Sequence, residues 1–437
     1  LEELTEFEIE EFSSDDLTAD AVDPAADLLV TTAVTVEPVE VASLADDVDA
    51  APLSVELAEF GPDSAAPSDM LASIGAIGGE GGGLGGRGKA GALARSSGGG
   101  ADTEAAVEQS LRWFLRHQLP DGSWSFNFNE CPTCMGKCSH GSADPRAERA
   151  AATALALLPY LGRGETHVKG PYRQQVQAGI GFLIKLAREN NGRVYNPDGG
   201  TLYTQGLVGI ALAECLAMSR DQALIPATQA VLNYIMQAQD SAGGGWRYHP
   251  GQAGDTSVVG WQVMALKSGF MAGIPVNPLT VSKAGAFLDF VQVDDGARYG
   301  YVDTSAPTDA RSAVGLLCRM YMGWKKDHPA MQKGVTLLAK RGPTEDLYYD
   351  YYATQIMHHM GGDLWTAWNA KMKPALLAAQ ATEGDEAGSW FDGFGTGHAS
   401  EVGGRLYCTA MATMILEVYY RHLPMYQTET VEREFRE

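Results

Sequence analysis

Residues 231–246, VLNYIMQAQDSAGGGW, join an amphipathic helix to the turn that ends it. Apolar residues recur at the spacing of one helix face, and Gly244-Gly245-Trp246 marks the turn. Gln239 stands between the helix and the turn. A unit of this kind cannot bury its apolar face alone, so further copies are expected to stack against it.

The same pattern returns with a period of about fifty residues, which is typical of a repeat architecture. Copies lie at residues 111–124, 181–195, 286–299 and 376–390, with a degenerate copy near 335–338. More apolar segments alternate with them, at about 148–161, 202–218, 256–272, 310–322, 348–360 and 404–420. Six amphipathic helices outside six apolar ones predict an all-α fold, an α6/α6 toroid built as a double ring of helices.

Composition predicts four segments. Residues 1–80 carry 21 acidic residues and no Lys or Arg, and the balance of −18 for residues 1–100 leaves only −5 of the total of −23 for the rest. Few aromatic and many acidic residues favour an irregular arm, and a Gly-dominated stretch favours a linker. The predicted domains are an acidic low-complexity arm (1–77), a Gly-rich linker (78–100), the toroid (101–426) and a charged C-terminal tail (427–437).

The charge distribution also restricts the partners. A nearly balanced toroid and an acidic arm offer no basic surface for phosphates, so we expect no nucleic-acid partner. The arm is instead expected to contact other copies of the chain. The sequence shows no transmembrane run of 18 apolar residues and no signal peptide, yet it starts at Leu1. We therefore expect a processed protein of the cell envelope, periplasmic or extracellular.

Three segments carry a family resemblance. Residues 113–124 and 232–246 resemble the Gln-Trp repeats of squalene and oxidosqualene cyclases, and residues 255–266 resemble the inner helix after the cyclase catalytic motif. The chain from 102 to 426 is thus similar to the terpenoid cyclase and protein prenyltransferase α/α-toroid superfamily. It is most similar to the bacterial, planctomycete-type prenyltransferase and squalene oxidase repeat proteins.

The catalytic motifs of these families are incomplete. The resemblance implies an Asp-x-Asp-Asp motif whose middle Asp protonates an alkene, but residues 252–256 read Gln-Ala-Gly-Asp-Thr. Gly254 takes the proton donor's place, and Asp255 is either a surviving acid or the N-cap of the following helix. The Asp-x-Cys pair and the distant His that bind zinc in prenyltransferases are also missing, since Thr256 and Ser257 follow Asp255 and no His accompanies Cys408.

Aromatic residues of the inner helices are candidate ligand contacts, because cyclases use aromatic faces to stabilise carbocations. The alternative is that they fill the core. The residues expected to line a cavity that binds an isoprenoid lipid are Trp261, Tyr203, Tyr349, Tyr352 and Tyr407.

A cysteine cluster follows the first outer helix. Cys131, Cys134, Cys138 and His140 supply the S and N ligands that zinc prefers. A disulfide between two of these cysteines, or free thiols, are the alternatives to a structural zinc site.

The incomplete motifs favour a noncatalytic, cyclase-like toroid that acts as a binding or structural module of a bacterial cell envelope. The alternative is a divergent isoprenoid cyclase or lipid-binding enzyme that uses Asp255 as its acid and the aromatic residues as its cavity wall.

Overall fold

The structure, a computed structural model, describes residues 98–139, 148–394, 397 and 400–422. The predicted arm, most of the linker, the C-terminal tail and His140 lie outside these residues.

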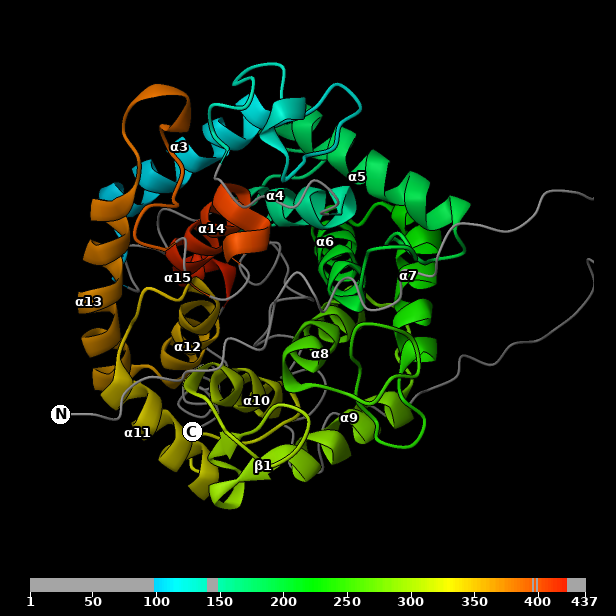
Figure 1. The fold of residues 1–437 in the computed structure, drawn as a ribbon, viewed down its shortest axis with the longest axis vertical. Helices are drawn as coiled ribbons and strands as arrows, with labels where there is room; N and C mark the ends of the chain where they lie inside the picture. Colours follow the sequence, from blue (N-terminus) through cyan, green and yellow to red (C-terminus); the bar gives the residue numbers. More distant parts are fainter. Residues whose placement is uncertain (1–97, 140–147, 395–396, 398–399, 423–437) are drawn as a thin grey trace, which may run out of the picture. The chain divides into compact units, whose positions relative to one another are not determined.

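The described part of the chain forms two concentric rings of helices (Figure 1). The outer ring consists of α3 (Ala101–His117), α5 (Arg173–Glu189), α7 (Ile225–Ala238), α9 (Pro278–Val291), α11 (Pro329–Arg341) and α13 (Gly362–Ala379). The inner ring consists of α4 (Arg149–Arg163), α6 (Leu202–Ser219), α8 (Thr256–Met271), α10 (Asp309–Tyr321), α12 (Leu347–Met360) and α14 (Ser400–Leu416). The predicted α6/α6 toroid is confirmed.

Short elements complete the fold. They are the 3-10 helices η3 (Phe128–Glu130), η4 (Gln222–Leu224), η5 (Asp294–Gly296) and η6 (Gly384–Glu386), the strands β1 (Gln292–Val293) and β2 (Arg298–Tyr299), and α15 (Val418–Arg421). The predicted sixth inner helix, 404–420, corresponds to two helices in the structure, α14 and α15. Gly404 has a non-helical backbone near the start of α14, and α15 follows as a separate helix.

The two rings differ in how their side chains are buried. On α5 the buried residues recur every three or four positions, so one face packs inward and the other meets solvent. Nearly every residue of α6 is buried, and α4, α5, α7 and α8 pack against it. By length and composition α6 is the one described helix that could cross a membrane, and 78% of that stretch is buried inside the ring. Its apolar composition is therefore explained by its position in the core of the ring.

A glycine in the turn after an outer helix lies directly on the next outer helix. Gly122, Gly192, Gly244 and Gly388 all have positive φ angles. A Cβ on Gly244 would lie 2.2 Å from the Lys283 carbonyl oxygen of α9. Glycine is required here for both the backbone conformation and the close approach.

Glutamine and tryptophan side chains fix the same turns. Gln239 Nε2 donates to the carbonyl of Gly244 at 2.7 Å and to that of Thr280 on the next outer helix at 2.9 Å. Trp246 Nε1 donates to the Ile235 carbonyl at 2.7 Å. Each copy is thereby tied both to its own helix and to its neighbour. Gln118 with Trp124, and Gln380 with Trp390, make the corresponding bonds.

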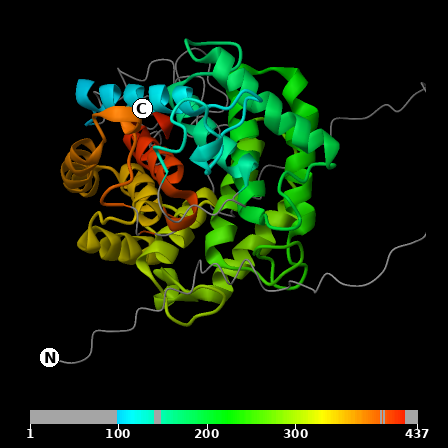
Figure 2. The ribbon, with the colours of Figure 1, turned by 45° about the horizontal axis from the view of Figure 1, so that its top comes forward.

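The ring closes where the last copy meets the first. Both views place α13 and α14 beside α3 (Figures 1 and 2). Gln380 Nε2 donates to the Ala106 carbonyl of α3 at 2.9 Å. On the inner ring, Arg421 donates to the Leu158 carbonyl of α4 at 2.7 Å and pairs with Glu214 of α6 at 3.0 Å. Closure therefore uses both rings.

The turn contact can be tested with Gly244→Ala. Gly251 lies in the same connection with a similar φ of +73°, but nothing lies within 4 Å of its added Cβ. We expect Gly251→Ala to cost about 1–2 kcal/mol through backbone strain alone. Gly244→Ala should cost roughly 1–3 kcal/mol more, because its methyl group also strikes α9. Urea unfolding measures both, and equal losses would contradict the contact.

Candidate functional site

The loop between α3 and α4 folds its three cysteines back onto the end of α3. Gly136 N–H donates to the Phe128 carbonyl at 2.9 Å, which closes a tight turn among the cysteines. Gly136 has φ +84°, and a Cβ there would lie 2.4 Å from Asn129 Oδ1, so the turn requires glycine. All three cysteine side chains are buried as a result.

His117, the last residue of α3, faces this cluster. Its Nε2 lies 3.2 Å from Cys138 Sγ, and its Nδ1 lies 2.7 Å from the Trp113 carbonyl oxygen. One ligand atom from each of His117, Cys134 and Cys138 lies within 4.8 Å of the others, and all three residues are buried. A group of one imidazole and two thiols at this spacing can hold a metal ion.

The predicted ligand set was Cys131, Cys134, Cys138 and His140. The structure brings Cys134 and Cys138 of this set together with His117, and His140 lies outside the described residues. Cys131 is buried beside Cys134, with its sulfur 3.8 Å from the Arg116 carbonyl oxygen. The sequence prediction did not include His117, although this residue ends the helix that precedes the cysteine loop. All six cysteines are free thiols.

Burial controls the protonation of Cys138 and His117. It raises the pKa of the Cys138 thiol to about 12, with the neighbouring Cys134 adding to the shift. It also lowers the pKa of His117 to about 4. At neutral pH the Cys138 thiol is therefore protonated and the His117 imidazole is neutral.

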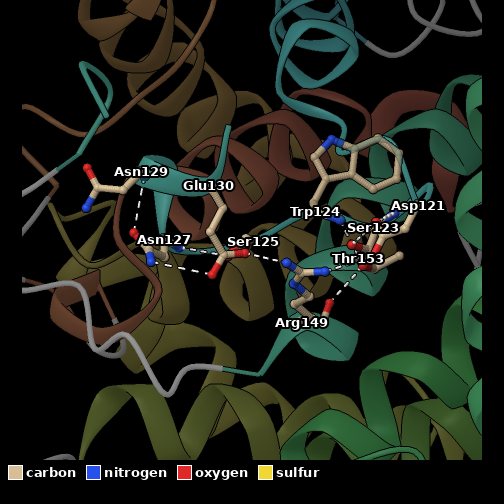
Figure 3. A network of polar contacts seen from close by, with 9 residues as sticks. All are labelled: Asp121, Ser123, Trp124, Ser125, Asn127, Asn129, Glu130, Arg149 and Thr153. Carbon is tan, nitrogen blue, oxygen red and sulfur yellow. Dashed lines mark hydrogen bonds and ion pairs between the residues drawn. The ribbon is translucent and has the colours of Figure 1, made fainter. Parts of the chain in front are cut away.

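A polar network holds the first half of this loop against α4 (Figure 3). Arg149, at the start of α4, pairs with Asp121 at 2.7 Å and with Glu130 at 2.5 Å. Trp124 N–H donates to Thr153 Oγ1 at 3.0 Å. The loop that carries the cysteines is thus positioned by an inner helix as well as by the outer helix α3.

Asp255, the candidate acid, is the N-cap of α8. Its side chain accepts a hydrogen bond from Val258 N–H at 2.8 Å and is fully buried. Tyr301 hydroxyl donates to the same carboxylate at 3.4 Å, and Arg247 Nε lies 3.8 Å from it. The carboxylate is therefore engaged by a helix end, a phenol and a cation.

Gly254, the residue before Asp255, has no room for a side chain. A Cβ on Gly254 would lie 2.6 Å from the Gly245 Cα and 3.0 Å from the Phe287 ring. Two parts of the connection between α7 and α8 meet backbone to backbone at this point. Any substitution would push them apart.

A cluster of tyrosines and one arginine surrounds Asp255. The Arg247 guanidinium lies over the rings of Tyr248 and Tyr301, at 5.1 and 5.3 Å from their centroids. The two tyrosine hydroxyls are 2.7 Å apart, and the Tyr203 ring lies 6.2 Å from that of Tyr248. Only Tyr203 was among the sequence candidates. Tyr248 and Tyr301 share a signal that we overlooked, because each stands two residues after the aromatic residue of a repeat turn.

The other aromatic candidates do not form one group. The Trp261 ring stacks on Tyr351 at 5.8 Å and meets the edge of Tyr352 at 5.8 Å. Tyr349 instead packs on Trp368 of the outer ring at 6.1 Å. The structure thus brings Trp261 and Tyr352 together and places Tyr349 between the rings.

Tyr407, on α14, is 5% exposed. Its hydroxyl has no hydrogen-bond partner among the described residues. Buried hydroxyls are usually satisfied, so this one marks a polar position inside the inner ring.

No protein-family model and no curated protein matches the sequence. Solved structures do match the fold. The chain is similar to the GH76A α-1,6-mannanase of Salegentibacter sp. HEL1_6, with 9% identity and a TM-score of 0.51 over 72% of this chain and 98% of that one. A type II terpene cyclase from Scytonema, in complex with merosterolic acid A, matches with 14% identity and a TM-score of 0.47 over 74% and 98%. At these identities the similarity shows the fold alone.

Lys267 of α8 offers a test of the buried charges in the inner ring. Its side chain is 3% exposed, and burial lowers its pKa from 10.5 to about 7. Between pH 7 and 10.5 the unfolded chain therefore binds more protons than the folded one, so this residue makes stability rise with pH in that window.

We expect Lys267→Met to stabilise the fold most below pH 7, by a few kcal/mol at about 1.4 kcal/mol per pKa unit. The gain should vanish above about pH 10.5, because the folded parent is already neutral there and the unfolded chain also loses its proton. Urea unfolding at several pH values measures it, with exposed Lys185→Met as the control. A gain independent of pH would contradict the buried charge.

Proposed function

We propose that this chain is a noncatalytic α/α toroid that serves as a binding or structural module. The main support for this proposal is that Gly254 has no space for a side chain. A class II cyclase needs a carboxylic acid at this position, and here the Gly245 backbone and the Phe287 ring occupy the volume that a side chain would need. The neighbouring Asp255 caps α8.

The surroundings of Asp255 support the same conclusion. A residue that protonates an alkene must be held in its protonated form. The Asp255 side chain is committed to other contacts, because it accepts a hydrogen bond from the Val258 N–H and lies 3.8 Å from the Arg247 Nε. Asp255 is thus better suited to fixing the helix end than to donating a proton.

A structural role would use the rigidity of the ring. Glutamine, tryptophan and glycine tie successive copies together, and Gln380 carries the same contact across the closure. The acidic residues of 1–77 and the Gly-rich residues of 78–100 would tether this ring to other copies of the chain at the bacterial cell envelope.

The proposal includes a structural zinc ion in the cysteine loop. His117, Cys134 and Cys138 supply imidazole and thiol ligands in a buried position, which is the setting of a closed structural site. Such an ion would stabilise a loop that has little regular structure of its own.

An isoprenoid-binding protein or divergent cyclase is the second candidate. The packed rings of Trp261, Tyr351 and Tyr352 favour it, because aromatic faces attract cationic intermediates. In this case Asp255 would be the acid.

Incubation of the full chain with squalene and with geranylgeranyl compounds separates the two candidates. We expect no cyclised product by gas chromatography and mass spectrometry. Asp255→Asn removes the acid but keeps a good N-cap, so the variant should fold with a stability change below about 1 kcal/mol. A product that this variant abolishes, and that exposed Asp303→Asn retains, would establish the enzyme.

The role of the arm has its own test. If the arm joins copies of the chain, residues 1–437 should have a larger mass in solution than residues 101–437, and the difference should grow with concentration. Light scattering after size exclusion measures both masses. Two monomers would remove the proposed role of the arm and leave the toroid a monomeric binding module.

A further inference from the structure

We propose that His117, Cys131, Cys134 and Cys138 together bind one Zn²⁺ ion, and that this site fastens the first copy of the ring to the last. The inference rests on the structural zinc of the proposed function. It names the four ligands of that ion and gives the ion a place in ring closure.

The orientation of His117 is that of a metal ligand. Nδ1 lies 2.7 Å from the Trp113 carbonyl oxygen, to which an Nδ1–H donates. Nε2 then carries the lone pair, and it points at the cysteines, 3.2 Å from Cys138 Sγ. In zinc sites the ligating imidazole typically donates its other N–H in this way, which fixes its tautomer and ring plane.

Trp113 provides a second polar group that faces the site. Its side chain is fully buried, and its indole N–H has no oxygen or nitrogen partner among the described residues. That N–H lies close enough to Cys138 to stabilise a negative charge on the sulfur. The Trp113 ring also stacks on His117, with centroids 4.2 Å apart. A buried N–H makes only a weak hydrogen bond to a neutral thiol, whereas a metal-bound thiolate is a good acceptor for it.

Cys131 is the fourth ligand. It stands three residues before Cys134, a spacing that lets two thiols share one tetrahedral ion without strain. Its side chain is 3% exposed and lies beside that of Cys134. Tetrahedral Zn–S bonds of about 2.3 Å place sulfurs ~3.8 Å apart. His117, Cys134 and Cys138 lie within 4.8 Å of one another and would contract only slightly around the ion, whereas Cys131 lies outside that group, beside Cys134, and would move in to complete it.

Arg405 is a positive side chain near such a site. Three thiolates and Zn²⁺ carry one net negative charge, which a nearby cation stabilises in a buried position. The Arg405 side chain is 5% exposed, pairs with Glu386 at 3.0 Å and also acts on Cys138 as a nearby positive charge. It belongs to α14, so this charge comes from the last copy of the repeat.

The cysteine loop also touches the last copy directly. Lys137 pairs with Asp385 at 3.0 Å, and Arg116 donates to the Ala387 carbonyl at 2.7 Å. Both partners lie in the turn before α14. A metal ion in the loop therefore makes rigid the surface on which the ring closes.

Zinc content of the full chain tests the ligand set. We expect one zinc per chain by elemental analysis after purification under reducing conditions. His117→Ala and Cys138→Ser should lower the affinity by more than the ~10–100-fold that loss of a hydrogen-bonded neighbour costs. His140→Ala is the matched control, because it removes an imidazole nearby in the sequence and should leave one zinc per chain.

Cobalt substitution keeps the test valid if a variant folds poorly. Co²⁺ in the parent should show the visible bands of a tetrahedral site, with sulfur charge-transfer intensity for three thiolates. Cys131→Ser should lower that intensity by about a third, as one of three thiolate ligands is lost. Zinc lost in His140→Ala but kept in His117→Ala would overturn the ligand set, as would a disulfide in a chain that binds no metal.

The closure role needs a separate measurement. Removal of zinc with a chelator should raise amide exchange in α3 and in residues 384–390, while residues 244–254 across the ring change little. Uniform exchange changes, or none near the closure, would overturn the fastening role. The assay for cyclised products is independent of metal content, so failure of this inference and failure of the proposed function give different results.

Discussion

The ring depends on the contact between each repeat turn and the next outer helix. A glycine with positive φ brings the two backbones together, as Gly244 does against Lys283, and Gln239 then bridges the turn to the same helix. Trp246 completes the turn by donating to the Ile235 carbonyl in the last turn of α7, where carbonyl groups lack intrahelical partners. Because Gly388 and Gln380 repeat it against α3, the last copy closes onto the first and leaves no end exposed.

Close backbone contact also shapes the segment before α8. Gly254 meets Gly245 and Phe287, so it has no space for a side chain, and the next residue, Asp255, caps α8. Around that cap, Arg247 lies 3.8 Å from the carboxylate and over the Tyr301 ring.

The point of closure is also where the chain departs most from a plain repeat. The first copy carries a long loop with three cysteines, and the last copy supplies Arg405 and the Asp385 turn against it. A metal ion at this place would strengthen the one junction whose two sides are farthest apart in sequence, where loop closure costs the most entropy.

The sequence by itself determined the double ring, because helical periodicity and turn glycines are local signals that recur in each copy. It also identified Asp255 as a possible cap and the cysteine loop as a possible metal site. Only the tertiary structure placed His117 beside Cys138, set Tyr349 apart from Trp261, and surrounded Asp255 with Arg247 and Tyr301. Those contacts join residues on different helices or across a folded loop, and their distances follow from how the rings pack rather than from spacing along the chain.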